Sequence, residues 1–338
     1  MVVANEPIIV ARTKDMPKEE WLKWRRKGIG GSDVGAIAGL NPWKTPLEVY
    51  LDKRGELPPE ENQSEAAYWG TVLEDVVAKE LKKRNEKWIQ RKNFLLAHPK
   101  HQFMQANVDR IVFDKERGPG ILEVKTTSAY LADDWKDGQI PDSYNLQANH
   151  YMAVTGYEYA WFAVLIGGQK YHQVMIERDE ELIDIIIELE SKFWEQVKRG
   201  EPPAVDGSAA SSRLLKHLYP EDNGEIIDLP EQETLELIEQ FKKGKELEKQ
   251  GRDLKNEAQN KLKAMLGENV GGRIPGYQIT SRTIQRDGYE VKPTKYRNFS
   301  IRKVGEKKLR KRKRKNVCCN DYHHGKIRRR WQYRTWLS

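Results

Sequence analysis

Gln105-Ala-Asn-Val-Asp-Arg-Ile-Val-Phe113 and Ile121-Leu-Glu-Val-Lys-Thr126 are the two stretches that decide the fold of this chain. Both mix apolar, β-branched and polar residues in the manner of half-buried strands. The segment between them, Asp114–Gly120, contains glycine and proline turn signals. We therefore predict that the two strands form an antiparallel hairpin.

The hairpin brings three charged side chains together. Alternation along a strand places Glu123 and Lys125 on the same face. Folding the hairpin about Arg117 sets Asp109 opposite Lys125 and diagonal to Glu123, within cross-strand reach. Two carboxylates and an ammonium group then share one patch.

Two neighbouring carboxylates repel each other unless a cation lies between them. Mg²⁺ binds one or two carboxylates, keeps several waters and binds substrate phosphate, while a lysine could orient or activate a water for in-line attack. A Glu-x-Lys tripeptide is also typical of an ordinary charge ladder on an exposed hairpin. The aspartate on the preceding strand favours the metal site.

This order of residues resembles the PD-(D/E)XK nuclease superfamily, in which an Asp precedes an (Asp/Glu)-x-Lys on the next strand. More narrowly, it is similar to the YqaJ-like viral recombinase family of lambda-exonuclease-like proteins, with Val108 in place of the usual proline. The resemblance implies an α/β fold with a mixed central sheet flanked by helices. It also implies Mg²⁺, with Mn²⁺ as a possible substitute, held by Asp109, Glu123, the Val124 carbonyl and Glu74.

Two helical segments supply further residues that the resemblance implies for the site. Residues 64–85 have apolar residues at helical spacing, and Glu74 lies at the edge of that stripe. It would support a metal-bound water, although an exposed glutamate is the usual fate of such a residue. A second helix begins near residue 143 and carries Tyr144, Gln147 and Tyr151. Buried helix aromatics are ordinarily core, but the resemblance implies that Gln147 steadies the site and that the tyrosines contact DNA.

A glycine-rich turn at residues 28–39 is the remaining motif. Ser32 is placed to cap a short helix there, and helix N-termini with free N–H groups bind phosphate, although plain capping also explains the pattern. In the resembled family, an arginine and a serine seven residues later hold the terminal 5′-phosphate of DNA. Arg25 and Ser32 have that spacing, with Arg26 as a substitute for the arginine.

Composition describes a polar chain with an unusual end. The 338 residues include 38% hydrophobic and 33% charged residues, which favours one large domain and an appendage. We predict a nuclease domain at 1–203, a helical and strand appendage at 204–301 in which residues 230–266 form a long helix or a helical hairpin, and a basic, disordered tail at 302–338.

The net charge of +8 arises from that tail. Residues 301–338 contain 15 Lys and Arg against Glu306 and Asp321, a net of +13, so the first 300 residues have a net charge of −5. DNA contacts by the body must therefore come from local patches, while the tail would bind nucleic acid nonspecifically.

Several protein classes are disfavoured. The cysteines, Cys318 and Cys319, are adjacent, which argues against a disulfide framework or a cysteine-ligated zinc and leaves oxygen ligands for any metal. The sequence contains no apolar run of membrane-spanning length and no secretory signal, so we expect no membrane contact and a cytoplasmic location, in a bacterial host or phage-encoded.

The resemblance implies a Mg²⁺-dependent DNA exonuclease that resects double-stranded ends 5′→3′ and leaves 3′ single strands for recombination. Its implied partner is a single-strand annealing protein of the RecT or Bet type, and its implied assembly is a homo-oligomeric ring, with a trimer favoured. Two alternatives stay open. One is an end-independent endonuclease of the same fold, and the other is a noncatalytic DNA-binding or scaffold protein that acts through the basic tail.

Overall fold

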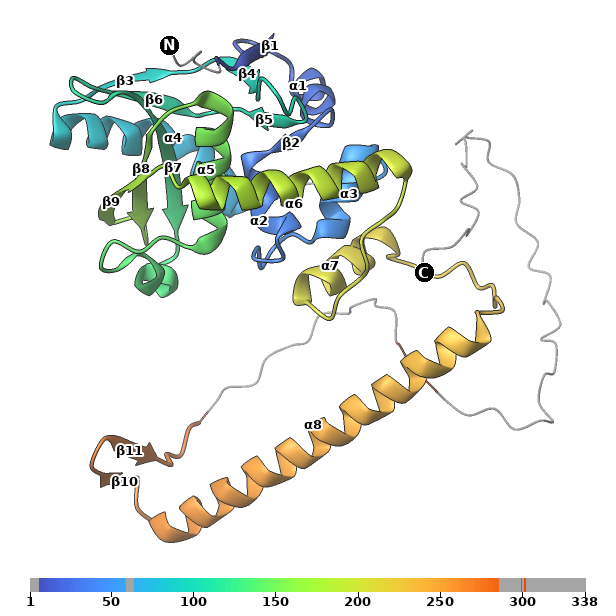
Figure 1. Ribbon diagram of the computed structural model, residues 1–338. Coiled ribbons are helices and arrows are strands. Elements are labelled where there is room, and N and C mark those ends of the chain that lie inside the picture. The colour runs from blue at the N-terminus through green and yellow to red at the C-terminus, as the bar shows by residue number, and fades with distance from the viewer. Residues whose placement is uncertain (1–5, 59–63, 286–298, 300, 302–338) are drawn as a thin grey trace, which may run out of the picture. The chain divides into compact units, whose positions relative to one another are not determined.

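The computed structural model describes residues 6–58, 64–285, 299 and 301. These residues form two compact units, the first ending at Tyr219 and the second beginning at Pro220 (Figure 1). The predicted tail at 302–338 lies outside the described residues.

A five-stranded mixed sheet forms the centre of the first unit, with strand order β3-β6-β7-β8-β9. Its strands are β3 (Trp88–Arg91), β6 (Arg110–Asp114), β7 (Gly118–Thr127), β8 (Tyr159–Ile166) and β9 (Lys170–Glu177). The β6–β7 and β8–β9 pairs are antiparallel hairpins, whereas β7 and β8 run parallel. The predicted α/β class and the predicted hairpin are confirmed.

A second sheet of four strands has the order β1-β4-β5-β2. It consists of β1 (Ile8–Arg12), β4 (Phe94–Ala97), β5 (Met104–Ala106) and β2 (Ile29–Gly30). The single strand predicted over residues 105–113 is therefore wrong. The chain leaves the smaller sheet after Ala106 and enters the larger one at Arg110, because Gln105 pairs with Ala97 while Arg110 pairs with Leu122. Asp109 lies in the crossing between the two sheets.

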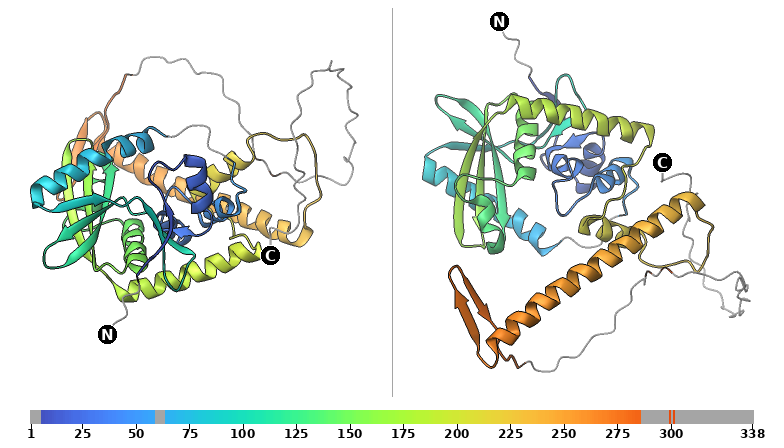
Figure 2. Two further views of the ribbon diagram at one scale, coloured as in Figure 1. Left: turned by 90° about the horizontal axis from the view of Figure 1, so that it is seen from above. Right: turned by 60° about the horizontal axis from the view of Figure 1, so that its bottom comes forward.

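Helices cover both faces of the five-stranded sheet (Figure 2). On one face, α4 (Glu65–Asn85) packs Val77 and Leu81 against the side chains of Leu122 and Val124. On the other, α5 (Asp142–Thr155) and the 3₁₀ helix Ala129–Trp135 pack against Phe162. The side chains of β7 therefore alternate between the α4 layer and the α5 layer, and Glu123 and Lys125 face the α5 layer.

The helix α6 (Glu180–Arg199) is joined to α5 and β5 through a buried polar contact. His150 Nδ1 lies 2.6 Å from Glu190 Oε1, and His150 Nε2 lies 2.9 Å from the carbonyl oxygen of Gln105. Both side chains are fully buried. This contact fixes α5, which carries Tyr144 and Gln147, against the smaller sheet.

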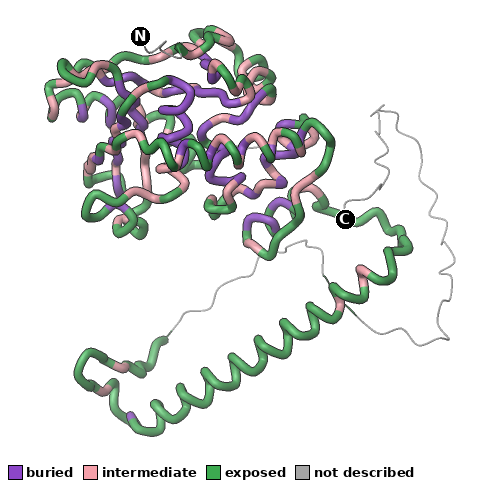
Figure 3. The backbone as a smooth tube through the Cα atoms, in the orientation of Figure 1, coloured by how far each residue is buried: buried purple, intermediate pink, exposed green. Residues whose placement is uncertain are grey.

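Four further helices complete the first unit: α1 (Lys18–Arg25), α2 (Gly31–Ile37), α3 (Pro46–Arg54) and α7 (Ala209–Leu218). The α7 helix packs Leu214 into a core shared with Leu47 and Phe193. Figure 3 marks the buried stretches of the first unit in purple. The first compact unit thus extends beyond residue 203, where sequence composition placed its end, to Tyr219.

The second unit contains α8 (Glu231–Leu266) and a hairpin of β10 (Gly271–Ile274) and β11 (Tyr277–Thr280). Of the two forms predicted for residues 230–266, the structure has the single helix and not the helical hairpin. No helix in the described part of the chain is both long and apolar enough to cross a membrane.

Candidate active site

The β6–β7 hairpin sets the register of the charged residues. Arg110 pairs with Leu122 and Asp114 with Gly118, so continuing the register by one residue places Asp109 opposite Glu123. The predicted pairing of Asp109 with Lys125 is therefore displaced by two residues. The turn is tighter than expected, because the Asp114 carboxylate accepts the N–H groups of Glu116 and Arg117.

The Glu-x-Lys pair of β7 is joined to α5 by a compact hydrogen-bond network. Lys125 Nζ donates to Glu123 Oε2 at 3.0 Å and to Gln147 Oε1 at 3.0 Å. Gln147 Nε2 donates to the same Glu123 oxygen at 3.0 Å. The amide of Gln147 thus fixes both members of the pair, and the structure brings together the three residues that the sequence placed on two separate elements.

Burial and like charge make the two carboxylates costly to ionise. Burial, followed by repulsion from Glu123, raises the pKa of Asp109 to about 8, although the N–H of Val124 donates to its carboxylate. Burial also raises the pKa of Glu123, against the opposing effect of Lys125. Burial lowers the pKa of Lys125, but attraction to Glu123 and Asp109 outweighs it and the net pKa is raised. The ammonium form of Lys125 is therefore favoured at neutral pH.

One carboxylate oxygen is left for a cation. Glu123 Oε1 is buried and has no hydrogen-bond partner among the described residues. A buried charged oxygen without a partner is costly, and a divalent cation between Glu123 and Asp109 would remove that cost. No group of three or more His, Cys, Asp or Glu able to hold a metal occurs within the described ranges. Two carboxylates and a backbone carbonyl still fit Mg²⁺, which retains several waters.

Glu74 reaches the edge of this site but has another partner. Its carboxylate forms an ion pair with Arg110, whose other guanidinium nitrogen pairs with Asp75. Its negative charge acts on both Asp109 and Glu123. Glu74 is thus close enough to influence the two carboxylates, while Arg110, which no local sequence pattern indicates, holds it beside them.

A second cluster is built around the glycine-rich turn. Arg25 donates to Ser32 Oγ at 2.6 Å, so the predicted seven-residue spacing does bring these side chains into contact. Arg26 instead donates to Asp52 at 3.2 Å and belongs to a different ion pair. The prediction that Ser32 caps the helix is wrong, because α2 begins at Gly31 and its N-cap is Gly30. The Ser32 hydroxyl does not cap the helix and instead accepts a hydrogen bond from Arg25.

Asp33 is the residue that sequence reasoning missed in this cluster. Its fully buried carboxylate lies 3.2 Å from Arg25, 3.1 Å from Lys44 and 2.6 Å from Lys53. Burial alone would raise the pKa of Asp33, but Lys44, Lys53 and Arg25 together hold it well below its usual range. Three cations around one carboxylate leave an excess of positive charge beside Ser32. An acidic residue directly after the serine was the available signal.

Tyr151 lies between the two clusters. A Cβ added to Gly31 would lie 2.5 Å from Tyr151 Cε1, so the turn beside Ser32 needs glycine to accommodate the ring. The Tyr151 hydroxyl in turn accepts a hydrogen bond of 3.3 Å from Gln147. The buried Tyr151 side chain therefore lies between the turn at Gly31 and Gln147, which contacts Glu123.

Tyr144 has a different place, next to the lysine and against the core. Lys125 Nζ lies 4.8 Å from the centroid of the Tyr144 ring. The same ring packs beside Trp135 at 5.7 Å between centroids. Tyr144 thus restricts the position of the ammonium group through cation–π contact.

Comparison with known proteins places the chain in a family. A family model described as the YqaJ-like viral recombinase domain matches residues 20–158. The uncharacterized protein YqaJ of Bacillus subtilis (strain 168) is 44% identical over 321 residues, which cover 88% of this chain and 98% of the relative.

Among solved structures, the alkaline exonuclease LHK-Exo from Laribacter hongkongensis is 20% identical with a TM-score of 0.45, covering 54% of this chain and 94% of that chain. A phage-related exonuclease from Haemophilus somnus 129PT is 13% identical with a TM-score of 0.37, covering 53% of this chain and 99% of that chain. These structures are too distant to carry an argument about the site. The extended match to the Bacillus subtilis relative shows that the chain belongs to the YqaJ-like viral recombinase family.

Proposed function

We propose that the protein is a Mg²⁺-dependent DNA exonuclease that resects double-stranded ends 5′→3′ and leaves 3′ single strands. The observation that carries the proposal is the buried Glu123 Oε1 beside Asp109, which has no hydrogen-bond partner in the described part of the chain. Lys125 is held over the same patch by Gln147. Membership of the YqaJ-like viral recombinase family and the names of the solved exonucleases agree with a nuclease.

Asp109, Glu123 and the Val124 carbonyl would hold the metal, with Glu74 at the edge of the site. When bound, a divalent metal supplies charge neutralisation at the phosphate and lowers the pKa of a water. Lys125 is held as an ammonium group, so it is suited to orienting a water and to stabilising negative charge on the phosphate.

The Arg25 cluster is proposed to hold the 5′-phosphate of a DNA end. Arg25 and Lys44 carry positive charge that Asp33 only partly neutralises, and Ser32 Oγ lies beside the guanidinium group. Guanidinium and hydroxyl groups bind phosphate oxygens well. Because Tyr151 packs against the glycine turn of this cluster and accepts a hydrogen bond from Gln147, a bound end would be presented to the carboxylates.

The test compares DNA with and without ends. Linear duplex with 5′-phosphate, linear duplex with 5′-hydroxyl and covalently closed circular DNA are incubated with the protein in Mg²⁺, in Mn²⁺ or in EDTA. We expect the 5′-phosphorylated strand to be degraded fastest, the circle to stay intact, and EDTA to stop the reaction. Cleavage of the circle would favour the end-independent endonuclease, and loss of the 3′ end first would contradict the polarity.

Family resemblance also supports two proposals about assembly. The 3′ single strand would pass to a single-strand annealing protein of the RecT or Bet type, and a ring, with a trimer favoured, would enclose the DNA. Co-purification with an annealing protein and the mass of the protein on DNA test these two points.

A further inference from the structure

The loop between α2 and α3 presents an exposed tryptophan on a fixed backbone. Trp43 is 71% exposed, although tryptophan side chains are highly buried on average. Asn41 Oδ1 accepts the N–H of Trp43 at 2.8 Å, and the Thr45 side chain caps the start of α3. Local hydrogen bonds therefore fix the backbone on both sides of an indole that remains exposed to solvent.

A guanidinium group covers one face of this indole. The guanidinium carbon of Arg213, on α7, lies 5.4 Å from the centroid of the Trp43 ring. Arg213 also donates to the carbonyl oxygen of Pro42 at 2.8 Å, which holds it against the loop. Leu214, the next residue of α7, packs in one core with Leu47 of α3, so both partners are anchored in the first unit. With 71% of Trp43 exposed, the described part of the first unit leaves the opposite face of the ring open.

The tryptophan adjoins the cluster proposed to hold the terminal 5′-phosphate. Lys44, the next residue, places its Nζ 3.1 Å from Asp33 Oδ1, the oxygen that Arg25 also contacts. Arg25 in turn donates to the Ser32 hydroxyl. An aromatic ring on a fixed backbone is thus the chain neighbour of one of the cations in the phosphate cluster.

Stacking on a nucleic-acid base is the contact that this pair is suited to make. Bases stack on aromatic rings and on guanidinium planes with little dependence on sequence, because every base has a π-face. The charge of Arg213 lies beside the ring, and the first 300 residues are net negative, so DNA contacts depend on local cations of this kind. An apolar protein partner would instead bury that charge without a counter-charge, which is costly.

We propose that Trp43 stacks, through its open face, on one of the first two bases of the strand whose 5′-phosphate lies in the Arg25 cluster. The inference rests on the proposed function, because that cluster defines where the strand begins. It adds a base contact to the phosphate contacts at the DNA end. Because stacking is tolerant of sequence, the same contact would hold each new end as the strand shortens.

Binding of the full-length chain to a DNA hairpin with one open end tests the inference without cleavage, because EDTA is present throughout. The open end carries a 5′-phosphate on normal nucleotides, a 5′-phosphate on two abasic nucleotides, or a 5′-hydroxyl on normal nucleotides. For the normal phosphorylated end, Trp43→Ala should raise the dissociation constant about tenfold, and Trp43→Phe should restore most of the affinity. For the abasic end, the wild type and Trp43→Ala should bind within about twofold of each other.

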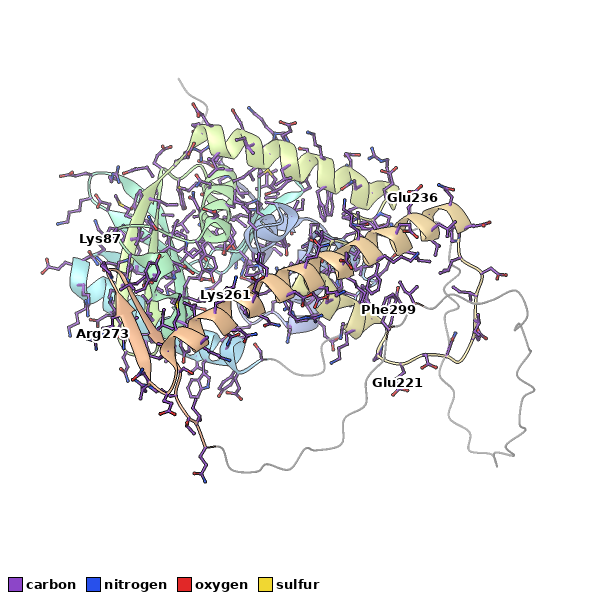
Figure 4. All side chains as sticks on the ribbon, turned by 90° about the horizontal axis from the view of Figure 1, so that it is seen from below. Lys87, Glu221, Glu236, Lys261, Arg273 and Phe299 are labelled. Atoms are coloured by element: carbon purple, nitrogen blue, oxygen red, sulfur yellow. The ribbon has the colours of Figure 1, made fainter. Side chains whose placement is uncertain are left out.

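The matched control is a second exposed tryptophan of the first unit. Trp88 is 54% exposed and packs against Phe113 at 4.5 Å between ring centroids. Figure 4 labels Lys87, which precedes Trp88 at the start of β3. Trp88 pairs with Phe113, whereas Arg110, beside Asp109, pairs three residues further along β3, so the control lies at the far end of this strand pair. Trp88→Ala should bind each hairpin as the wild type does.

The wild type on phosphorylated and hydroxyl ends separates this inference from the function on which it rests. Equal binding of the two ends by the wild type would overturn the 5′-phosphate cluster and, with it, the stacking contact. If the wild type prefers the phosphate but Trp43→Ala binds the normal end equally tightly, the stacking contact alone is overturned. Equal weakening of the normal and abasic ends by Trp43→Ala would also overturn it, because a base contact cannot be lost from an end that has no base.

Discussion

Asp109 is a residue whose ionised form is disfavoured both by burial and by neighbouring negative charge. Its carboxyl pKa is raised to about 8, first by burial and then by repulsion from Glu123. An acid whose pKa is higher in the folded than in the unfolded state contributes stability below its unfolded pKa of about 4, and that contribution is lost as the pH rises through the folded value. The site is thus destabilising at alkaline pH unless a cation binds.

Replacing Asp109 with asparagine tests this cost of ionisation. In EDTA, raising the pH from 5 to 9 should lower the free energy of unfolding of the wild type by at least about 1 kcal/mol more than that of Asp109→Asn. Adding Mg²⁺ should stabilise the wild type but not the variant, because binding to the folded state alone raises stability. Urea unfolding at both pH values measures the two effects. Equal responses of the two proteins to Mg²⁺ would contradict the proposed metal ligand.

Asp33 shows the opposite behaviour. Its pKa lies well below the usual range, because Lys44, Lys53 and Arg25 outweigh burial. Its contribution to stability is therefore present above the unfolded pKa of about 4 and lost as the pH falls through the lower folded value.

The Asp33→Asn variant should lose about 3–5 kcal/mol in the free energy of unfolding, because the fully buried ammonium group of Lys53 is left without a carboxylate partner. The matched control is Asp52→Asn, which breaks a more exposed pair with Arg26 and should cost no more than about 1 kcal/mol. Chemical denaturation at pH 7 compares them. Similar losses from both substitutions would contradict the claim that the buried Asp33 carboxylate stabilises the fold more than the more exposed Asp52–Arg26 pair does.

At the scale of elements, β7 packs very closely against Tyr159 of β8. A Cβ at Gly120 would lie 2.3 Å from the ring of Tyr159, which is almost completely buried. A Cβ at Gly70 of α4 would lie 3.5 Å from Thr126 Oγ1, an ordinary contact. The strand glycine is therefore required by close packing, and the helix glycine is not.

The same substitution at these two positions should act in opposite directions. Gly120→Ala should lower the free energy of unfolding by about 1–3 kcal/mol through overpacking. Gly70→Ala should be neutral or raise it by up to about 1 kcal/mol, because alanine favours the helix. Thermal and urea unfolding of the two variants decide the point. A neutral Gly120→Ala would show that the Tyr159 ring can move aside.

Local patterns predicted elements better than the joins between them. Alternation and turn residues identified the hairpin and the Glu-x-Lys strand, and apolar spacing identified the helix at 64–85, because these signals act over a few residues. The break between β5 and β6 was missed because it depends on which partner strand each half meets. The two-residue register error came from the Asp114 side chain, which tightens the turn.

At the scale of the molecule, long-range packing assembles sites that no local pattern displays. Spacing alone paired Arg25 with Ser32, but the cluster around Asp33 also requires Lys44 and Lys53 from later segments. Similarly, the sequence gives no sign that Arg110 pairs with Glu74, or that Tyr151 fills the space beside Gly31. Side-chain chemistry was predictable, whereas its convergence depended on how the two sheets and α5 fit together.

The most direct measurement of the central claim is Mg²⁺-dependent degradation of a linear duplex labelled on its 5′-phosphorylated strand. It is made with the wild type, with Lys125→Ala and with Lys170→Ala, a control on the exposed end of β9. We predict degradation by the wild type and the control, none in EDTA, and a loss of at least about 100-fold for Lys125→Ala. Equal rates for Lys125→Ala and the wild type, or a wild type that binds DNA without degrading it, would contradict the assignment of this site as a nuclease centre.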